Sequence, residues 1–222
     1  MLNIYSIDYL DQVAPETFRS LLSRLPDVFR IKVQRYRRWQ DAYGSLFGKL
    51  LLRLALQRAG LSGELGTLRF NDYGKPFLEN GPEFNLSHSG NRVVCVLSGQ
   101  GRVGIDLEAV SDLAIDDFQT QFTAAEWSRI TGSATPLYTF YRYWTAKESL
   151  IKADGRGLQI PLDQLVVGDA GETEGIALNE NRWYIRELDA FPGYACHIAC
   201  ETTPFQVNIE TLTWKDVEGW SY

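Results

Sequence analysis

Residues 103–108 read Val-Gly-Ile-Asp-Leu-Glu, and their alternation predicts a β-strand over 103–109. Successive side chains of a strand point to opposite faces, so Asp106 and Glu108 share one face with Gly104. Their carboxylates would lie roughly 6–7 Å apart. Two carboxylates this close repel each other unless a cation or a proton intervenes. We interpret Gly104 as leaving space for a ligand beside them. An edge strand with a solvated acidic face is the alternative for this segment alone.

Residues 144–152 read Trp-Thr-Ala-Lys-Glu-Ser-Leu-Ile-Lys and belong to a helix that we expect over 139–153. Glu148 lies one turn before Lys152, on a face that also carries aromatic and aliphatic residues. A helical ion pair worth about 0.3 kcal/mol explains the two charges but not their apolar neighbours. Three carboxylates beside a lysine indicate a Mg²⁺ site for chemistry on a phosphate.

The composition excludes several classes of protein. The chain has 222 residues, 45% of them hydrophobic and 23% charged, which is enough for a globular core. A net charge of −6 argues against a general nucleic-acid partner. We expect no membrane segment, because no apolar run of about 18 residues occurs. The N-terminus lacks a signal-peptide pattern and only three cysteines occur, so we expect a cytoplasmic protein.

The basic residues are concentrated in one short segment. Positions 30–38 hold Arg30, Lys32, Arg35, Arg37 and Arg38. Several positive charges in one segment can bind one polyanionic ligand. A solvated basic helix turn is the alternative. His88 ends a predicted strand just before the Gly90-Asn91 turn, where it could bind phosphate or act as an acid or base; a structural histidine is the alternative there.

The order of predicted elements indicates an α+β fold. We expect helices over 15–22, 41–60, 116–122, 124–130 and 139–153, and strands over 2–7, 68–70, 84–87, 92–97, 103–109, 165–167, 182–188 and 194–200. Val93–Leu97 resembles Ala195–Ala199, so we infer two similar lobes, residues 1–101 and 102–222, joined near Gly99. The last residues, 214–222, would pack as an extension. Cys196 and Cys200 flank His197 on a strand, so its side chain points away from both and we expect no zinc there.

Five short motifs, in order, give the chain a clear family resemblance. They are Tyr73-Gly74-Lys75-Pro76, Phe84-Asn85-Leu86-Ser87-His88-Ser89-Gly90, residues 103–108, residues 144–152 and Gly155-Arg156-Gly157-Leu158. Over residues 30–200 the chain resembles the 4′-phosphopantetheinyl transferases of the surfactin-synthetase-activating (Sfp) type. The resemblance implies two α+β lobes related by a pseudo-twofold axis, with coenzyme A in a cleft between them. It also implies Mg-dependent transfer of 4′-phosphopantetheine from coenzyme A to a serine of an apo acyl or peptidyl carrier protein. The product released would be adenosine 3′,5′-bisphosphate.

The resemblance also implies roles for individual residues. Mg²⁺ would be bound by Asp106, Glu108 and Glu148, and catalysis would involve Asp106, Glu148 and Lys152. Glu148 would act as general base, directly or through a water, and Lys152 would face the diphosphate. The 3′-phosphate would be bound by Lys32, Arg35, Ser45 and His88. The adenine, ribose and remaining coenzyme A contacts would come from Tyr73, Gly74, Lys75, Ser87 and Ser89. The family often has lysine at position 35 and threonine at position 45, but Arg35 and Ser45 keep the hydrogen-bond donor.

Two other classes of function remain as alternatives. A metal-dependent nuclease or phosphohydrolase could use the same carboxylates, and a non-catalytic module could bind coenzyme A without Glu148. We expect a monomer with the 1–101 lobe on the 3′-phosphate and adenine side of the coenzyme A site and the 102–222 lobe carrying the metal and diphosphate site. The carrier protein would dock on that second lobe near Leu113, Ile115, Phe118 and Phe122.

Overall fold

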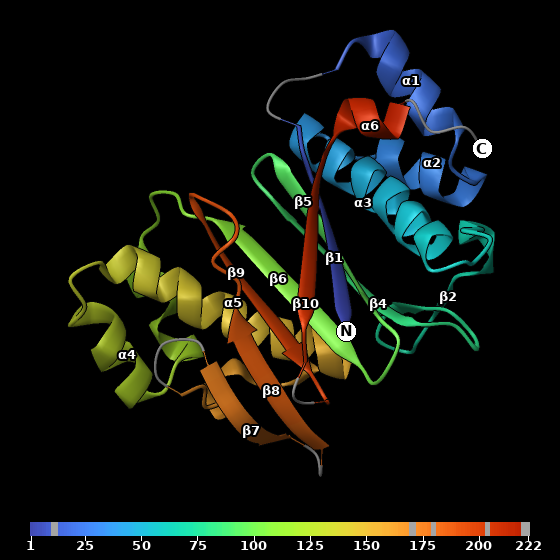
Figure 1. The fold of residues 1–222 in the computed structure, drawn as a ribbon. Helices are drawn as coiled ribbons and strands as arrows, with labels where there is room; N and C mark the ends of the chain where they lie inside the picture. Colours follow the sequence, from blue (N-terminus) through green and yellow to red (C-terminus); the bar gives the residue numbers. More distant parts are fainter. Residues whose placement is uncertain (10–12, 169–171, 179–180, 203–204, 219–222) are drawn as a thin grey trace. The chain divides into compact units, whose positions relative to one another are not determined.

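The computed structural model describes residues 1–9, 13–168, 172–178, 181–202 and 205–218. Two compact units form (Figure 1). The first contains residues 1–69, 77–99 and 206–222, and the second contains residues 70–76 and 100–205. Residues 206–222 fall in the first unit because β10 pairs with the first strand of the chain, and residues 70–76 fall in the second unit.

The first unit is built on a four-stranded sheet in the order β10-β1-β5-β4. β1 pairs antiparallel with β5 and parallel with β10, and β4 and β5 form a hairpin across the Gly90-Asn91 turn. The strands are β1 (Leu2–Asp8), β4 (Glu83–Ser89), β5 (Arg92–Ser98) and β10 (Val207–Thr213). The helices are α1 (Pro15–Ser23), α2 (Asp27–Gln34), α3 (Trp39–Arg58) and α6 (Trp214–Glu218), with a 3₁₀ turn, η1 (Leu65–Thr67).

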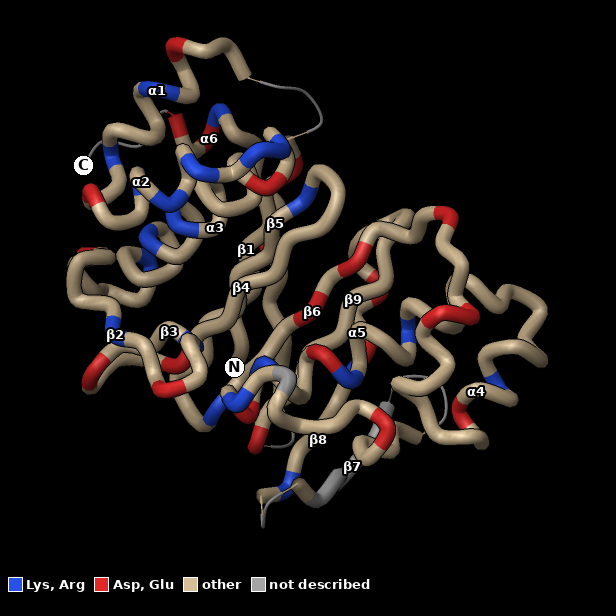
Figure 2. Tube along the Cα trace, turned by 180° about the vertical axis from the view of Figure 1, so that it is seen from behind, with Lys and Arg blue, Asp and Glu red and all other residues tan. Residues whose placement is uncertain are grey.

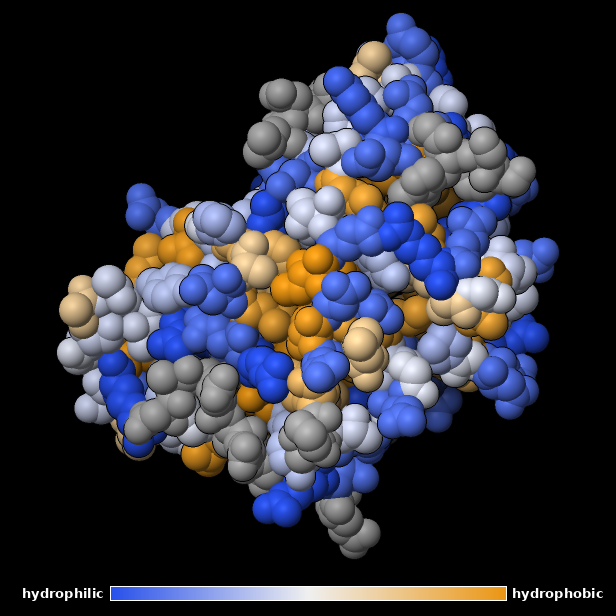
Figure 3. Space-filling model, in the orientation of Figure 1, coloured by the Kyte–Doolittle hydropathy of each residue, from blue (hydrophilic) through white to orange (hydrophobic). Residues whose placement is uncertain are grey.

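Helix α3 forms the core of this unit. It packs on β5, β4 and β1, and its residues Leu46, Phe47, Leu51 and Ala55 are fully buried. The helix ends before Gly60, whose φ of +79° suits a glycine. Burial of these side chains at about 25 cal/mol per Å² supplies the main driving force for folding the unit. The surface over α1 and α2 is mostly hydrophilic in the space-filling view (Figure 3).

The second unit is built on an antiparallel sheet in the order β6-β9-β8-β7. The strands are β6 (Val103–Ala109), β7 (Glu172–Leu178), β8 (Asn181–Glu187) and β9 (Tyr194–Cys200). Its helices are α4 (Ala124–Thr131) and α5 (Pro136–Asp154), with 3₁₀ turns η2 (Ile115–Gln121), η3 (Gly157–Gln159) and η4 (Leu162–Gln164). Helix α5 packs across β6, β9 and β8 (Figure 1). A two-stranded sheet, β2 (Arg69–Phe70) with β3 (Pro76–Phe77), frames the turn between them.

Most predicted elements are present, two differ from the prediction, and several observed strands and helices were not expected. Residues 165–167 are not a strand, because the amide of Val167 donates to the carboxylate of Glu126 (3.0 Å) and is not available to a sheet. The segment expected as a helix over 116–122 is the 3₁₀ turn η2. Strands β7 and β10 were not expected. Among the described residues, no helix is both long and apolar enough to cross a membrane.

Candidate active site

Asp106 on β6 and Lys152 on α5 form the charged centre of the second unit. Lys152 Nζ lies 2.6 Å from Asp106 Oδ1, and Asp106 is only 3% exposed. The pair forms because α5 crosses the face of β6 that carries the even-numbered side chains. The alternative of a solvated acidic edge is therefore wrong for Asp106. A buried carboxylate stays charged at little cost only when a cation or hydrogen bonds compensate it, and here Lys152 provides that charge.

Gly104 allows this close approach of helix and strand. A Cβ atom built on Gly104 would lie 2.1 Å from the carbonyl oxygen of Ser149 and 2.3 Å from the amide nitrogen of Ala153. Both are backbone atoms of α5, so they cannot turn away. The interpretation that Gly104 leaves space for a ligand is wrong, because the helix backbone fills that space. Gly104 instead brings Glu148 and Lys152 onto the acidic strand.

Glu148 lies on α5, half-buried, one turn before Lys152. Burial raises the pKa of the Glu148 carboxyl, the negative charge of Asp106 raises it further, and Lys152 lowers it. The two carboxylates therefore interact, as the sequence predicted from strand and helix separately. A carboxylate held close to another one and to an ammonium group can accept a proton from a neighbouring hydroxyl.

The third predicted metal ligand, Glu108, lies two residues beyond Asp106 on β6 and is half-buried. Among the described residues, no group of three or more His, Cys, Asp or Glu side chains is arranged to hold a metal ion. The donor set of Asp106, Glu108 and Glu148 consists of carboxylate oxygens, which suit Mg²⁺. The proximity of Asp106 and Glu148, seen in the raised pKa, fits a site that gains from a cation. The three-ligand site remains a prediction.

His197, on β9, is a residue at this centre that sequence reasoning did not place there. It pairs with Asp106 across β6 and β9, so the two side chains share a face. The Thr145 hydroxyl donates to the carbonyl of Tyr141 (2.8 Å), so it accepts from Nδ1–H of His197 (2.7 Å). Nε2 of His197 is buried and has no hydrogen-bond partner among the described residues. The contact links β9 to α5 one turn before Glu148. It could be predicted only from the register of β6 and β9, which a single sequence does not give.

A buried ion pair holds the other side of α5. Lys147 Nζ lies 2.8 Å from Oε2 of Glu126 on α4, and both side chains are 1% exposed. Lys147 also donates to the carbonyl of Leu162 (2.8 Å), and its ammonium lies 5.2 Å from the centre of the Phe122 ring. Glu126 in addition caps α4 through Thr123. Lys147, in the centre of the 144–152 motif, therefore has a structural role, and it fixes the helix that carries Glu148.

In the first unit, His88 packs directly against helix α3. A Cβ atom on Gly44 would lie 2.7 Å from the His88 ring, so the ring covers Gly44, the neighbour of Ser45. Two residues earlier on β4, Leu86 lies 3.9 Å from a Cβ atom built on Gly48, an ordinary van der Waals distance. The structure thus brings the predicted residues His88 and Ser45 to the same part of α3. Ser87 is buried and lies on the opposite face of the strand from His88, as Ser89 does.

The basic segment follows α2 and the start of α3 (Figure 2). Lys32 lies in the last turn of α2, and Arg35 is the residue that ends that helix; both are exposed. Of the five basic residues at 30–38, only Arg30 forms an ion pair with a carboxylate among the described residues, with Asp27 of its own helix. The positive charge of this segment is therefore largely uncompensated, as expected for a site that binds an anion.

Residues 71–75 form a turn that is fixed to the end of α5. The backbone amides of Tyr73 and Lys75 both donate to Asn71 Oδ1, at 3.0 and 2.8 Å, and Gly74 has a φ of +84°. Lys75 Nζ donates to the carbonyl of Ala153 (3.0 Å), and Asn71 donates to that of Gly155 (2.9 Å). Lys75 thus interacts with the negative end of the α5 dipole. The Tyr73 side chain is 55% exposed. Sequence reasoning missed Asn71, although asparagine three residues before glycine is a turn signal.

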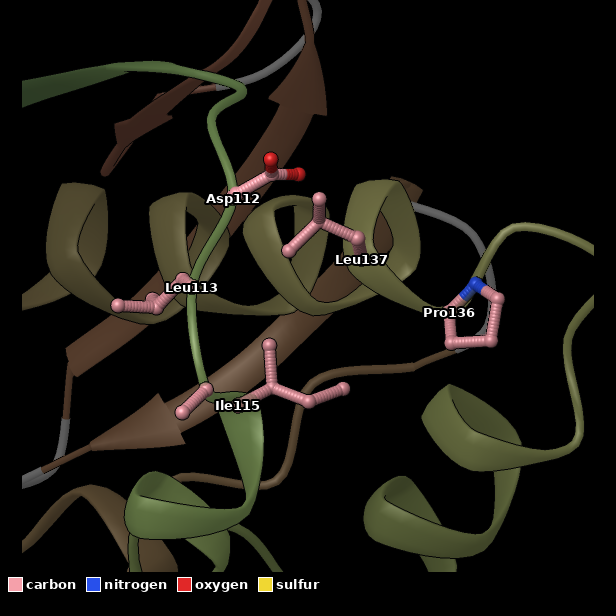
Figure 4. Close-up of a pocket in the computed structure, with 6 residues that line it drawn as sticks. Asp112, Leu113, Ile115, Pro136 and Leu137 are labelled. Atoms are coloured by element: carbon pink, nitrogen blue, oxygen red, sulfur yellow. The ribbon is translucent and has the colours of Figure 1, made fainter.

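A cavity of about 590 Å³ lies between the segment after β6 and the first turn of α5. Asp112, Leu113, Ala114, Ile115, Pro136 and Leu137 line it (Figure 4). Leu113 is 41% exposed, so apolar surface is open here. Phe122 is buried and stacks on Trp127, and Phe118 packs against Phe140 and Trp144. Phe122 belongs to the core, whereas Ile115 and Phe118 are half-buried and pack against it. The carrier-docking surface at Leu113, Ile115 and Phe118 remains a prediction.

Two α+β units, an acidic strand bound to a Glu–Lys helix and a basic helix together define a class of group-transfer enzymes. Residues 102–199 match the 4′-phosphopantetheinyl transferase superfamily. The chain belongs to this superfamily and is a transferase of the Sfp type.

Named relatives match most of the chain. The 4′-phosphopantetheinyl transferase gsp of Aneurinibacillus migulanus is 33% identical over 88% of this chain and 84% of its own length. The 4′-phosphopantetheinyl transferase Sfp of Bacillus subtilis (strain 168) is 28% identical over 97% of this chain and 100% of its own. The L-aminoadipate-semialdehyde dehydrogenase-phosphopantetheinyl transferase of Mus musculus is 32% identical over 57% of this chain and 47% of its own.

Proposed function

We propose that this protein transfers the 4′-phosphopantetheine group of coenzyme A to a serine of an apo acyl or peptidyl carrier protein, releasing adenosine 3′,5′-bisphosphate. The observation that carries the proposal is the cluster of Asp106, Glu148 and Lys152, formed by β6 and α5 in a chain of this superfamily. Carboxylates beside an ammonium group suit the transfer of a phosphoryl-linked group, which depends on positioning and charge.

We further propose that Asp106, Glu108 and Glu148 hold a Mg²⁺ ion. Bound there, the ion would neutralise charge on the diphosphate of coenzyme A. The proposal is supported by the carboxylate donor set and by the interaction of Asp106 with Glu148. A test independent of turnover is thermal unfolding with and without MgCl₂. We expect Mg²⁺ to raise the Tm of the wild type and not that of Glu148→Gln; equal shifts would contradict the site.

The other residues of the cluster would perform the proton and charge steps. The Glu148 carboxylate would take the proton from the attacking serine hydroxyl, and the raised pKa of Glu148 makes it a better base. The serine oxygen would form a bond to the phosphorus bearing pantetheine as the bond to the leaving bisphosphate breaks. Lys152 would stabilise the negative charge on that leaving group. His197 and Lys147 keep α5 in place for these steps through the contacts described above.

We assign the coenzyme A contacts to the two units separately. In the first unit, Lys32, Arg35, Ser45 and His88 would bind the 3′-phosphate, supported by the uncompensated charge of the segment and the packing of His88 beside Ser45. Ser87 and Ser89 would serve the nucleoside from the same unit. In the second unit, the turn of Tyr73, Gly74 and Lys75 would bind adenine and ribose, and Lys152 the diphosphate.

The carrier protein would dock on the apolar surface at Leu113 and Ile115, beside the cavity lined by Pro136 and Leu137. Arg129 on α4 is exposed and could attract an acidic carrier helix. Arg142 on α5, by contrast, donates to the Glu187 carboxylate at 2.8 Å, so its charge is already paired. Leu113→Glu should raise the KM for the carrier at an unchanged KM for coenzyme A. An unchanged carrier KM would exclude this surface.

The decisive experiment is incubation with coenzyme A, MgCl₂ and an apo carrier protein, followed by mass spectrometry of the carrier. We expect the carrier to gain one phosphopantetheine, and we expect Asp106→Asn and Glu148→Gln to lower kcat by about 10³-fold. Asp189→Asn, an exposed carboxylate of the same unit, is the matched control. Hydrolysis of coenzyme A without a carrier would indicate a phosphohydrolase instead. Binding without any reaction would indicate a coenzyme A-binding module.

A further inference from the structure

Lys49 on α3 is a half-buried lysine that the proposed mechanism does not use. It lies four residues after Ser45, on the same face of the helix. Its ammonium lies 5.6 Å from the centre of the Phe29 ring on α2, so it points toward that helix. The sequence did not single out Lys49, because a lysine within a long helix is ordinarily a solvated one.

The surroundings of Lys49 contain no compensating negative charge. Lys49 forms no ion pair or hydrogen bond with any described residue. The charged group that acts on it is Lys32, a second cation one turn from Phe29 on α2. The third group near it is the Cys95 thiol, whose pKa is raised by burial, so the thiol stays neutral. Burial and Lys32 together lower the pKa of Lys49 to about 8.

Two lysines held near each other without a carboxylate are unfavourable in the free protein. Partial burial of an unpaired charge is unfavourable, and a cation–π contact offsets only part of that cost. An anion bound between Lys32 and Lys49 would remove the repulsion. A phosphate monoester near neutral pH carries between one and two negative charges, so it suits two ammonium groups better than a singly charged phosphodiester does.

We propose that Lys49 binds the 3′-phosphate of the nucleotide together with Lys32, and that it selects 3′-phosphorylated over 3′-dephosphorylated ligands. This inference rests on the proposed function for the identity of the nucleotide. The geometry supports it, because Lys49 lies one turn from Ser45 and near Lys32. Lys49 also forms no ion pair with a carboxylate of any described residue. Lys49 is thus a specificity-determining residue in addition to Lys32, Arg35, Ser45 and His88.

Calorimetric titration of the full chain tests this without any transfer reaction. The probes are adenosine 3′,5′-bisphosphate and adenosine 5′-monophosphate, which differ in the 3′-phosphate. We expect Lys49→Met to weaken binding of the bisphosphate about tenfold or more and to change binding of the monophosphate less than about twofold. Lys215→Met is the matched control, because Lys215 lies 5.7 Å from the Trp214 ring in the same unit but is exposed; its titrations should equal those of the wild type.

Thermal unfolding of the ligand-free protein distinguishes a binding lysine from a structural one. Because Lys49→Met removes a half-buried charge that Lys32 repels, we expect it to raise the Tm while it weakens bisphosphate binding. A lower Tm with an unchanged preference for the bisphosphate would overturn the proposal, as would equal weakening of both nucleotides. If Lys49→Met loses the preference for the bisphosphate but the wild type modifies no carrier, the proposed transferase activity fails and the 3′-phosphate site stands. If the wild type modifies the carrier but Lys49→Met keeps the preference, the transferase activity stands and the role of Lys49 fails.

Discussion

The two units use the same kinds of residue for different ends. Each has one long helix on a four-stranded sheet, α3 and α5, and each helix carries a lysine whose ammonium lies close to a phenylalanine ring. Lys147 is paired with Glu126, whereas Lys49 has only Lys32 for a charged neighbour. In unit 2 the carboxylate of Glu126 therefore balances the charge of Lys147. In unit 1 no carboxylate balances Lys49 and Lys32, and we infer that a ligand does so.

The two histidines of the chain show the same difference. His88 in unit 1 is exposed and packs on α3 at Gly44, whereas His197 in unit 2 is fully buried and bonded to Thr145 of α5. The glycines at the helix–sheet contacts differ too. In unit 1 the helix supplies Gly44, and a side chain covers it; in unit 2 the strand supplies Gly104, and the helix backbone covers it. The contact in unit 2 is therefore the less adaptable one.

The largest difference between the two units should appear when each of these glycines is replaced by alanine. Gly104→Ala places a Cβ within 2.3 Å of two α5 backbone atoms, so we expect a loss above about 4 kcal/mol and an insoluble or unfolded protein. Gly44→Ala meets only the His88 ring, which can turn, and the higher helix propensity of alanine offsets the contact by about 1 kcal/mol. Urea denaturation measures both. Similar losses in the two variants would contradict the contrast.

Replacing Lys147 or Lys49 by methionine should change the free energy of unfolding in opposite directions. Lys147→Met leaves Glu126 buried without its cation, so we expect a loss of about 3–5 kcal/mol in the free energy of unfolding. The double variant Lys147→Met/Glu126→Leu should regain a large part of that loss, as measured by urea denaturation. Lys49→Met should instead stabilise the ligand-free protein. A destabilised Lys49→Met would mean that both lysines are scaffold residues.

Acid should weaken the fold through His197. Burial, with a smaller contribution from Arg142, lowers the pKa of His197 to about 3 in the folded protein. Its contribution to stability is therefore complete above the unfolded-state pKa of about 6.5 and is lost as the pH falls toward 3. At pH 5 the loss is about 2 kcal/mol. Denaturation curves at pH 7 and pH 5 should show a smaller loss for His197→Asn than for the wild type, and equal losses would contradict this role of His197.

The smallest effect concerns the like-charged pair of unit 2, Asp106 and Glu148. Because the folded-state pKa of Glu148 is raised, its stabilising contribution exists at low pH and is lost as the pH rises through that pKa. Glu148→Gln should therefore raise the Tm by a few degrees at pH 7.5 in the absence of Mg²⁺, and this gain should disappear near pH 4. Scanning calorimetry at the two pH values measures it; a lower Tm at pH 7.5 would mean that Lys152 outweighs the repulsion.

Much of the site could be predicted from local pattern. The strand at 103–109 and the helix carrying Glu148 occur where the alternation and helical spacing put them, since each depends on neighbours within a few residues. The prediction that Gly104 leaves space for a ligand is wrong, because the backbone of α5 occupies that space. A glycine that faces a ligand and one that faces a helix backbone look alike in sequence. Pairing of His197 with Asp106, and of β10 with β1, joins residues far apart in the chain, and period alone does not specify such register.

The parallel pairing of β10 with β1 has a consequence for biosynthesis. Strand β1 begins at Leu2 but its neighbour β10 ends at Thr213, so this pairing forms only after residue 213 has been synthesised. Residues 100–205 of the second unit, by contrast, are complete before β10 emerges. Until then the β10 side of β1 is an unpaired strand edge, the kind of surface on which chaperones act.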